Sequence, residues 1–162
     1  MKNILFLLFF GFSLLSFSKG ENYTTLILVR HAEKNNESDT STLTPAGYER
    51  AERISGMLAN TDIAAIYATP FIRTILTASP TAALLNLPVT MYQPHEISEV
   101  DLMASTHKGK TILVVGHSNT IPKIVNHYTG STLENLTTYA DLFILNISHK
   151  PKFKSWYLHL TY

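Results

Sequence analysis

Short apolar runs alternate along this chain with segments in which apolar residues recur every three or four positions. The runs are β-branched or aliphatic and are short, which is typical of buried strands. The recurring segments have the period of a helix that buries one face. The expected strands cover residues 24–29, 63–68, 89–92 and 111–115. Four helices are expected: two start at residues 45 and 70, and two cover residues 98–106 and 120–128.

Capping residues mark several helix ends. Thr44 and Pro45 are typical of a helix start, because threonine caps free N–H groups and proline fits the first helical position. Pro70 is expected to open the next helix, and Pro80 is expected to kink or divide it. Gly130 is expected to end the last helix.

Two alternating segments close the chain. Residues 142–147 and 153–160 flank the polar residues 149–152, which is the pattern of a β-hairpin. Strands that alternate with helices favour an α/β fold. We therefore expect a three-layer α/β sandwich, in which helices flank a mainly parallel central sheet and the C-terminal hairpin forms an antiparallel edge.

The first twenty residues have the features of a secretory signal peptide. Lys2 precedes an almost wholly apolar run of fourteen residues, Ile4–Phe17, which is short for a membrane-spanning helix. Small residues allow cleavage after Ser18 or after Gly20. The sequence thus predicts a signal peptide over 1–20, a mature domain over 21–162 without a stable membrane span, and export to a periplasm or the medium. An uncleaved anchor is the alternative interpretation.

Length and composition narrow the class of protein. A chain of 162 residues suits one domain, and 45% hydrophobic residues suit a packed core. The formal net charge of +1 argues against broad binding to nucleic acid. The chain has no cysteine, which excludes disulfides, cysteine-rich zinc sites, iron–sulfur clusters and thiol nucleophiles.

The residues that carry chemistry follow predicted strands. Arg30 and His31 come directly after the first strand, and His117 follows the strand at 111–115. In a parallel sheet such strand ends line one crevice. Arg73 lies at the start of the second helix, where its planar guanidinium can bind phosphate oxygens. Two arginines and two histidines suit a phosphoryl group, whereas arginine repels metal ions and no H-E-x-x-H spacing is present.

Four segments also carry a family resemblance. In order and spacing they resemble the histidine phosphatase superfamily, which has the phosphoglycerate mutase-like fold, and they are closest to its short single-domain members. The segments are Leu28-Val29-Arg30-His31-Ala32-Glu33-Lys34, Leu43 to Ala51, Tyr67-Ala68-Thr69-Pro70 with Arg73-Thr74 and Thr77-Ala78, and Val114 to Thr120.

The resemblance implies a mechanism without a cofactor or a metal. His31 is then the nucleophile, and Arg30, Arg73 and a cationic His117 form the phosphate pocket, with Ser118 beside them at a helix start. The expected activity is hydrolysis of a phosphate ester, a phosphoanhydride or phosphohistidine through a phosphohistidine intermediate. The expected partner is a phosphorylated small molecule or phosphoprotein.

The general acid is the open element of this site. Family members protonate the leaving oxygen from a Glu after a middle strand or from an Asp directly after the second histidine. Ser118 occupies the latter position, so Glu96 is the preferred acid, with Glu99 and Asp101 as alternatives. A missing acid would favour substrates with good leaving groups.

Other activities compete with this hypothesis. A catalytically quiet phosphate-binding module of the same fold fits the uncertain acid. A mutase is a further alternative, although a short exported protein has no obvious access to cytosolic sugar phosphates.

Overall fold

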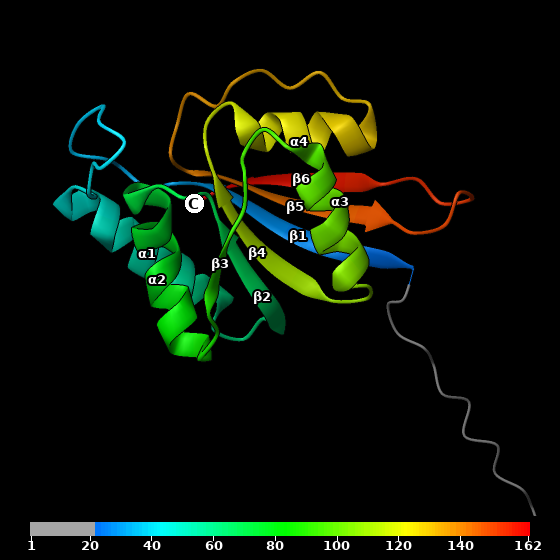
Figure 1. Cartoon of the computed structure of the whole chain (residues 1–162), viewed down its shortest axis with the longest axis horizontal. Helices are drawn as coiled ribbons and strands as arrows, with labels where there is room; N and C mark the ends of the chain where they lie inside the picture. Colours follow the sequence, from blue (N-terminus) through cyan, green and yellow to red (C-terminus); the bar gives the residue numbers. More distant parts are fainter. Residues whose placement is uncertain (1–21) are drawn as a thin grey trace, which may run out of the picture.

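A computed structural model describes residues 22–162, and the signal peptide predicted for 1–20 lies outside the described residues (Figure 1). The elements alternate as the sequence pattern predicts. In chain order they are β1 (Tyr23–Arg30), α1 (Pro45–Leu58), β2 (Ile63–Ala68), α2 (Ile72–Leu85), β3 (Val89–Met91), α3 (Ile97–Thr106), β4 (Thr111–Gly116), α4 (Thr120–Thr129), β5 (Asp141–Ser148) and β6 (Trp156–Thr161).

One six-stranded sheet with the order β3-β2-β4-β1-β5-β6 forms the centre of the molecule. Strands β1 to β4 are parallel, while β5 runs antiparallel to β1, and β6 to β5. The predicted mainly parallel sheet with an antiparallel C-terminal hairpin is therefore confirmed. Because β2, β4 and β1 are neighbours, the ends of these three strands lie together.

Helices cover both faces of the sheet, which makes three layers (Figure 1). Leu26 and Leu28 of β1 pack with buried residues of α3 and α4. Ile27 and Val29 point to the other face, toward buried residues of α1 and α2. A strand covered on both faces needs apolar residues at every position, which explains the continuous runs in the sequence. No helix in residues 22–162 is long and apolar enough to cross a membrane.

The helix boundaries test the capping predictions. The Thr44 side chain accepts a hydrogen bond from Gly47 N, and Gly130 ends α4 with φ of 70°, so both predicted caps are confirmed. Pro70 does not open α2, since the helix starts at Ile72 after an extended Phe71. Pro80 lies inside α2 without dividing it.

The start of β6 also differs from the prediction. The strand begins at Trp156, three residues after the expected start, because the connection between the two strands is longer than the sequence pattern indicates. In that connection, Phe153 N donates to the Lys150 carbonyl and Ser148 N donates to the Ser155 hydroxyl. These turn contacts occupy the residues that alternation assigns to the strand.

Candidate active site

Two histidines meet at the carboxyl ends of β1 and β4. Arg30 pairs with Gly116 in the parallel register, and His31 N donates to the Gly116 carbonyl at 2.9 Å. The rings of His31 and His117 lie edge to face, with centroids 5.4 Å apart. The prediction that both imidazoles share one crevice is therefore confirmed.

Gly116 allows β4 to turn directly into the start of α4. A Cβ atom there would lie 2.8 Å from Ile121 Cδ1 and 2.9 Å from Thr120 Oγ1, which is closer than packed atoms allow. His117 N donates to Thr120 Oγ1 at 2.9 Å and so holds the turn. The glycine thus brings the amino end of α4 close to His117.

His31 has a defined tautomer. Its Nδ1 lies 2.8 Å from the Ala32 carbonyl oxygen, which can only accept a hydrogen bond. Nδ1 must therefore carry the proton, which leaves the lone pair of Nε2 free in the neutral imidazole. Ala32 N donates to the buried Thr77 Oγ1 at 2.9 Å, so α2 anchors the loop that orients this ring.

The surroundings of His31 keep it neutral. The residue is 3% exposed. Burial lowers the pKa of His31 to about 4, and the nearby charges of Arg30 and Arg73 act in the same direction. At neutral pH the ring is consequently an unprotonated nitrogen base with one free nucleophilic atom.

His117 is also neutral in this structure. Its pKa is lowered to about 3, mainly by burial, and the nearby charges of His31 and Arg73 also lower it. Its Nε2 lies 2.8 Å from Thr69 Oγ1, which itself donates to Thr74 Oγ1, so Nε2 carries the proton. The sequence does not reveal this burial, so it gives no sign that the ring is neutral before an anion binds. A bound phosphate dianion would favour the protonated form.

Two arginines at this site form no ion pair with a carboxylate of residues 22–162. The Arg30 guanidinium stacks on the Tyr139 ring at 4.0 Å, and its Nη1 donates to the Thr138 carbonyl at 3.1 Å. Arg73, 8% exposed, stacks on Phe71 at 4.4 Å. In both, Nε is buried without a hydrogen-bond partner among the described residues.

Arg50 provides an internal contrast. It is similarly enclosed, but its Nη2 and Nε bind both oxygens of Glu33 at 2.8–3.0 Å. No ion pair within residues 22–162 involves Arg30 or Arg73. Enclosed cations without a counter-ion are costly unless an anion binds them. The pair is therefore a candidate anion-binding site beside His31.

A cavity of about 430 Å³ joins these groups. Of the residues proposed from the sequence, it brings together Arg30, His31, Arg73, His117 and Ser118. Lys34, Phe71, His95, Asn119 and Asn135 also line it. No Asp or Glu of the described residues lines the cavity, and none of their His, Asp and Glu side chains forms a cluster of three suited to a metal ion.

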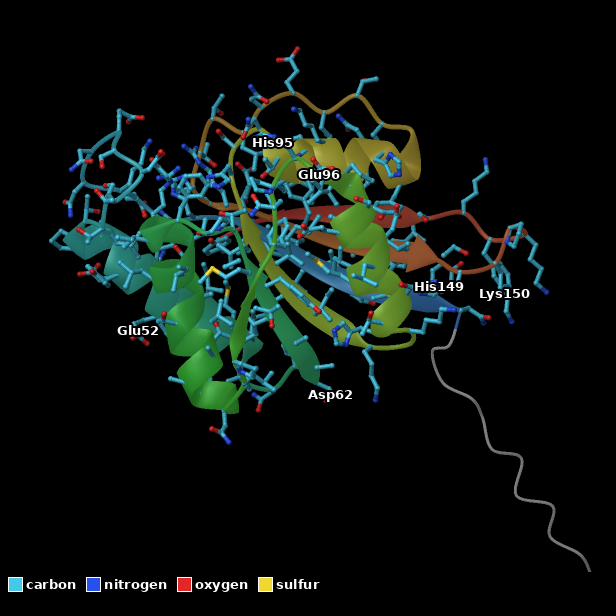
Figure 2. All side chains as sticks on the ribbon, viewed as in Figure 1. Glu52, Asp62, His95, Glu96, His149 and Lys150 are labelled. Carbon is cyan, nitrogen blue, oxygen red and sulfur yellow. The ribbon has the colours of Figure 1, made fainter. Side chains whose placement is uncertain are left out.

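The three candidate acids lie elsewhere. Glu96 is exposed and lines a neighbouring groove beside α4, next to His95 at the start of α3 (Figure 2). Glu99 Oε2 accepts a hydrogen bond from Gln93 N at 2.8 Å. Asp101 accepts one from the Tyr128 hydroxyl at 2.6 Å. The structure therefore does not bring Glu96, Glu99 or Asp101 into the cavity.

Sequence reasoning did not assign a role to four residues of the site. Thr69 belongs to a quoted motif, and its position directly after β2 was an available signal. Phe71 and Tyr139 support the two guanidinium groups. Tyr139 comes from an irregular segment after α4, which carries no periodic pattern. His95 was interpreted as an ordinary histidine, because no motif includes it.

Comparisons with known proteins agree with this geometry. A family model described as the histidine phosphatase superfamily (branch 1) matches residues 26–102, a range that contains Arg30, His31 and Arg73. No curated protein sequence matches the chain.

Solved structures share the fold over most of the chain. The protein histidine phosphatase SixA, in complex with tungstate, has 16% identity over 85% of this chain and 96% of its own, with a TM-score of 0.69. Phosphoglycerate mutase from Bacillus anthracis str. Sterne has 14% identity over 89% and 94%, with a TM-score of 0.70. YhfR from Bacillus stearothermophilus has 18% identity over 78% and 92%, with a TM-score of 0.64.

Proposed function

Because this chain belongs to the histidine phosphatase superfamily, we propose that it is a metal-independent phosphohydrolase that forms a phosphohistidine intermediate on His31. One observation supports this proposal above the others. The free Nε2 of His31 stands beside two guanidinium groups that form no ion pair within residues 22–162. Phosphoryl transfer requires a nucleophile and, beside it, groups that bind the phosphoryl oxygens.

In the first step, His31 Nε2 attacks phosphorus, so a P–N bond forms while the P–O or P–N bond to the leaving group breaks. Arg30, Arg73 and the free N–H groups at the start of α4 stabilise the charge on the equatorial oxygens. His117 gains a proton as the dianion binds and becomes a further donor. The Ala32 carbonyl orients His31 and stabilises the positive charge that develops on its ring.

In the second step, water attacks phosphorus and the P–N bond breaks. Inorganic phosphate leaves, and His31 returns to its neutral form. These residues supply the positive charge that a metal ion supplies in other phosphatases. The reaction therefore requires no cofactor.

A poor leaving group needs a proton as it departs. We assign the role of proton donor to His95 ahead of Glu96. His95 and His117 both line the cavity, and the charge of His95 contributes to the lowered pKa of His117. Imidazole is the side chain whose ordinary pKa lies nearest neutrality, where a general acid works best. His95 also lines the adjoining groove, whereas Glu96 lines that groove without lining the cavity and would have to move to reach the leaving atom.

Phosphohistidine on a protein is the substrate that we favour, with phosphoanhydrides next. No carboxylate of residues 22–162 lines the cavity, and a phosphoramidate or anhydride needs less help from an acid than an alkyl phosphate does. SixA, which has the same fold, is described as a protein histidine phosphatase. If the protein is exported, as its first twenty residues predict, the substrate must be accessible outside the cytoplasm.

A catalytically quiet phosphate-binding module is the second candidate, and the same lack of a carboxylate in the cavity favours it. Trapping the intermediate distinguishes the two. The protein is mixed with radiolabelled phosphoramidate, acetyl phosphate or a phosphohistidine peptide and quenched in alkali. We expect label on His31 that is stable in alkali and lost in acid. Phosphate binding without label or turnover on any substrate would favour the quiet module, and activity that EDTA abolishes would favour metal chemistry.

A further inference from the structure

Lysines gather at the end of the sheet opposite the cavity. Seven lysines lie in the described residues, and five of them are in two connections at this end. All five are exposed: Lys108 and Lys110 lie between α3 and β4, and Lys150, Lys152 and Lys154 lie between β5 and β6. We call these five residues the lysine face.

The two connections form one surface, because both attach to the start of β1. Gly109 N donates to the Tyr23 carbonyl at 3.0 Å, and His149 N donates to the Asn22 carbonyl at 2.8 Å. The charge of Lys108 also contributes to a lowered pKa of His149, after burial. Lysines that are distant in sequence therefore act on the same solvent region.

Few acids oppose this charge. The segments 102–133 and 142–162 contain no Asp or Glu, and no ion pair within residues 22–162 involves the lysine face. Asp62 lies at the same end, at the start of β2, but Figure 2 places it apart from His149 and Lys150. A dense, unneutralised group of cations attracts a polyanionic surface.

Aromatic side chains accompany the lysines. Phe153 is 37% exposed, packs against Tyr23 at 5.9 Å between ring centroids, and lies beneath the Lys152 ammonium at 5.0 Å. Trp156 is 47% exposed at the start of β6. Exposed aromatic rings among lysines are typical of surfaces that enter the headgroup region of a bilayer. They distinguish this face from a simple solvated charge cluster.

The chain itself leads from this face to an apolar segment. Residues 4–17 are almost wholly apolar, and only residues 18–21 separate them from Asn22. Four residues span at most about 14 Å when fully extended. Whenever the apolar segment lies in a bilayer, whether before cleavage or as an anchor, the lysine face is held close to the lipid headgroups.

We propose that the lysine face binds the anionic headgroups of a phospholipid bilayer. The cavity lies at the carboxyl ends of β1 and β4, whereas the face lies at their starts, so the bound protein presents its site away from the membrane. The proposal does not depend on the proposed function. Each lysine near an anionic surface strengthens binding by about fivefold, so replacement of all five should weaken it by about three orders of magnitude.

Vesicle binding tests this inference with protein that carries the N-terminus made by its native host. The probes are phosphatidylcholine vesicles with and without phosphatidylglycerol, at low and high salt. We expect binding that requires phosphatidylglycerol and falls with salt. Trp156 is the only tryptophan, so its emission should shift to shorter wavelength on binding. A variant with all five lysines changed to Gln should lose the shift and most of the binding.

A control variant, Arg53→Gln with Lys123→Gln, removes two charges elsewhere on the surface and should bind as the wild type does. Equal binding to both kinds of vesicle, or undiminished binding by the five-lysine variant, would overturn the proposal. Binding to short double-stranded DNA as tight as to phosphatidylglycerol vesicles would also overturn it, since the face would then be a general polyanion site. Thermal melting of each variant confirms that these exposed substitutions leave the fold intact.

Discussion

Replacing Arg73 with Met should separate stability from function in this protein. The Arg73 guanidinium is enclosed. Within residues 22–162 it forms no ion pair, and its one hydrogen bond runs from Nη1 to the Ser38 carbonyl at 3.3 Å. Methionine keeps the packing against Phe71 and removes the unpaired charge. Because an enclosed unpaired cation destabilises the ligand-free fold, we expect the free variant to be as stable as the wild type or more so.

Anion binding should change in the opposite direction. A charge-assisted hydrogen bond contributes about 1.5–3 kcal/mol, so loss of Arg73 should weaken phosphate or tungstate binding by roughly 10- to 150-fold. Phosphate at about 100 times its dissociation constant stabilises the wild type by about 2.7 kcal/mol, which raises Tm by several degrees. At the same phosphate concentration, the Tm of Arg73→Met should rise much less.

Arg50→Met is the matched control. It leaves Glu33 without its partner, which should cost about 1–3 kcal/mol, while phosphate still raises Tm. Both variants can be measured by calorimetry across a phosphate titration. A loss of stability in Arg73→Met as large as that in Arg50→Met would contradict this prediction, and so would phosphate stabilising Arg73→Met as strongly as the wild type.

Four further predictions concern the nucleophile, the titrating groups, the acid and the N-terminus. His31→Ala should lower turnover by at least ~10³-fold with an unchanged circular dichroism spectrum, and comparable activity would exclude His31 as the nucleophile. The pKa values of His31 and His117 are lowered to about 4 and about 3, so the unfolded chain binds more protons than the folded protein below about pH 6.5. The free energy of unfolding should therefore fall as the pH drops from about 6.5 toward 4. Thermal melting across this pH range should show a smaller fall in a variant with both histidines changed to Ala. His95→Gln should slow hydrolysis of an alkyl phosphate by about 10²-fold and hydrolysis of an activated aryl phosphate little, whereas Glu96→Gln should affect neither reaction. The reverse pattern would assign the role of general acid to Glu96. N-terminal sequencing of protein from the native host should read from Lys19 or Glu21, and an intact Met1 in a membrane fraction would indicate an anchor instead.

Local sequence patterns were sufficient for the order of elements and for part of the site. The apolar runs predict the strands because both faces of the sheet are covered, so each strand carries its own signal. Thr44 and Gly130 predict helix ends because capping depends on a few consecutive residues. Arg30, His31 and His117 were found for a related reason, since they follow such runs directly and parallel strands end at one edge.

Contacts between distant segments decided the rest. Tyr139 supports Arg30 from an irregular segment more than a hundred residues further along the chain, and no local pattern reports such a pairing. The choice between His95 and Glu96 depends on which of the two lines the cavity, and only the folded chain shows that His95 does and Glu96 does not. The neutral state of His117 follows from burial beneath groups contributed by several elements. Composition and periodicity describe each segment separately, whereas burial, charge and orientation in the site arise only when the segments are packed together.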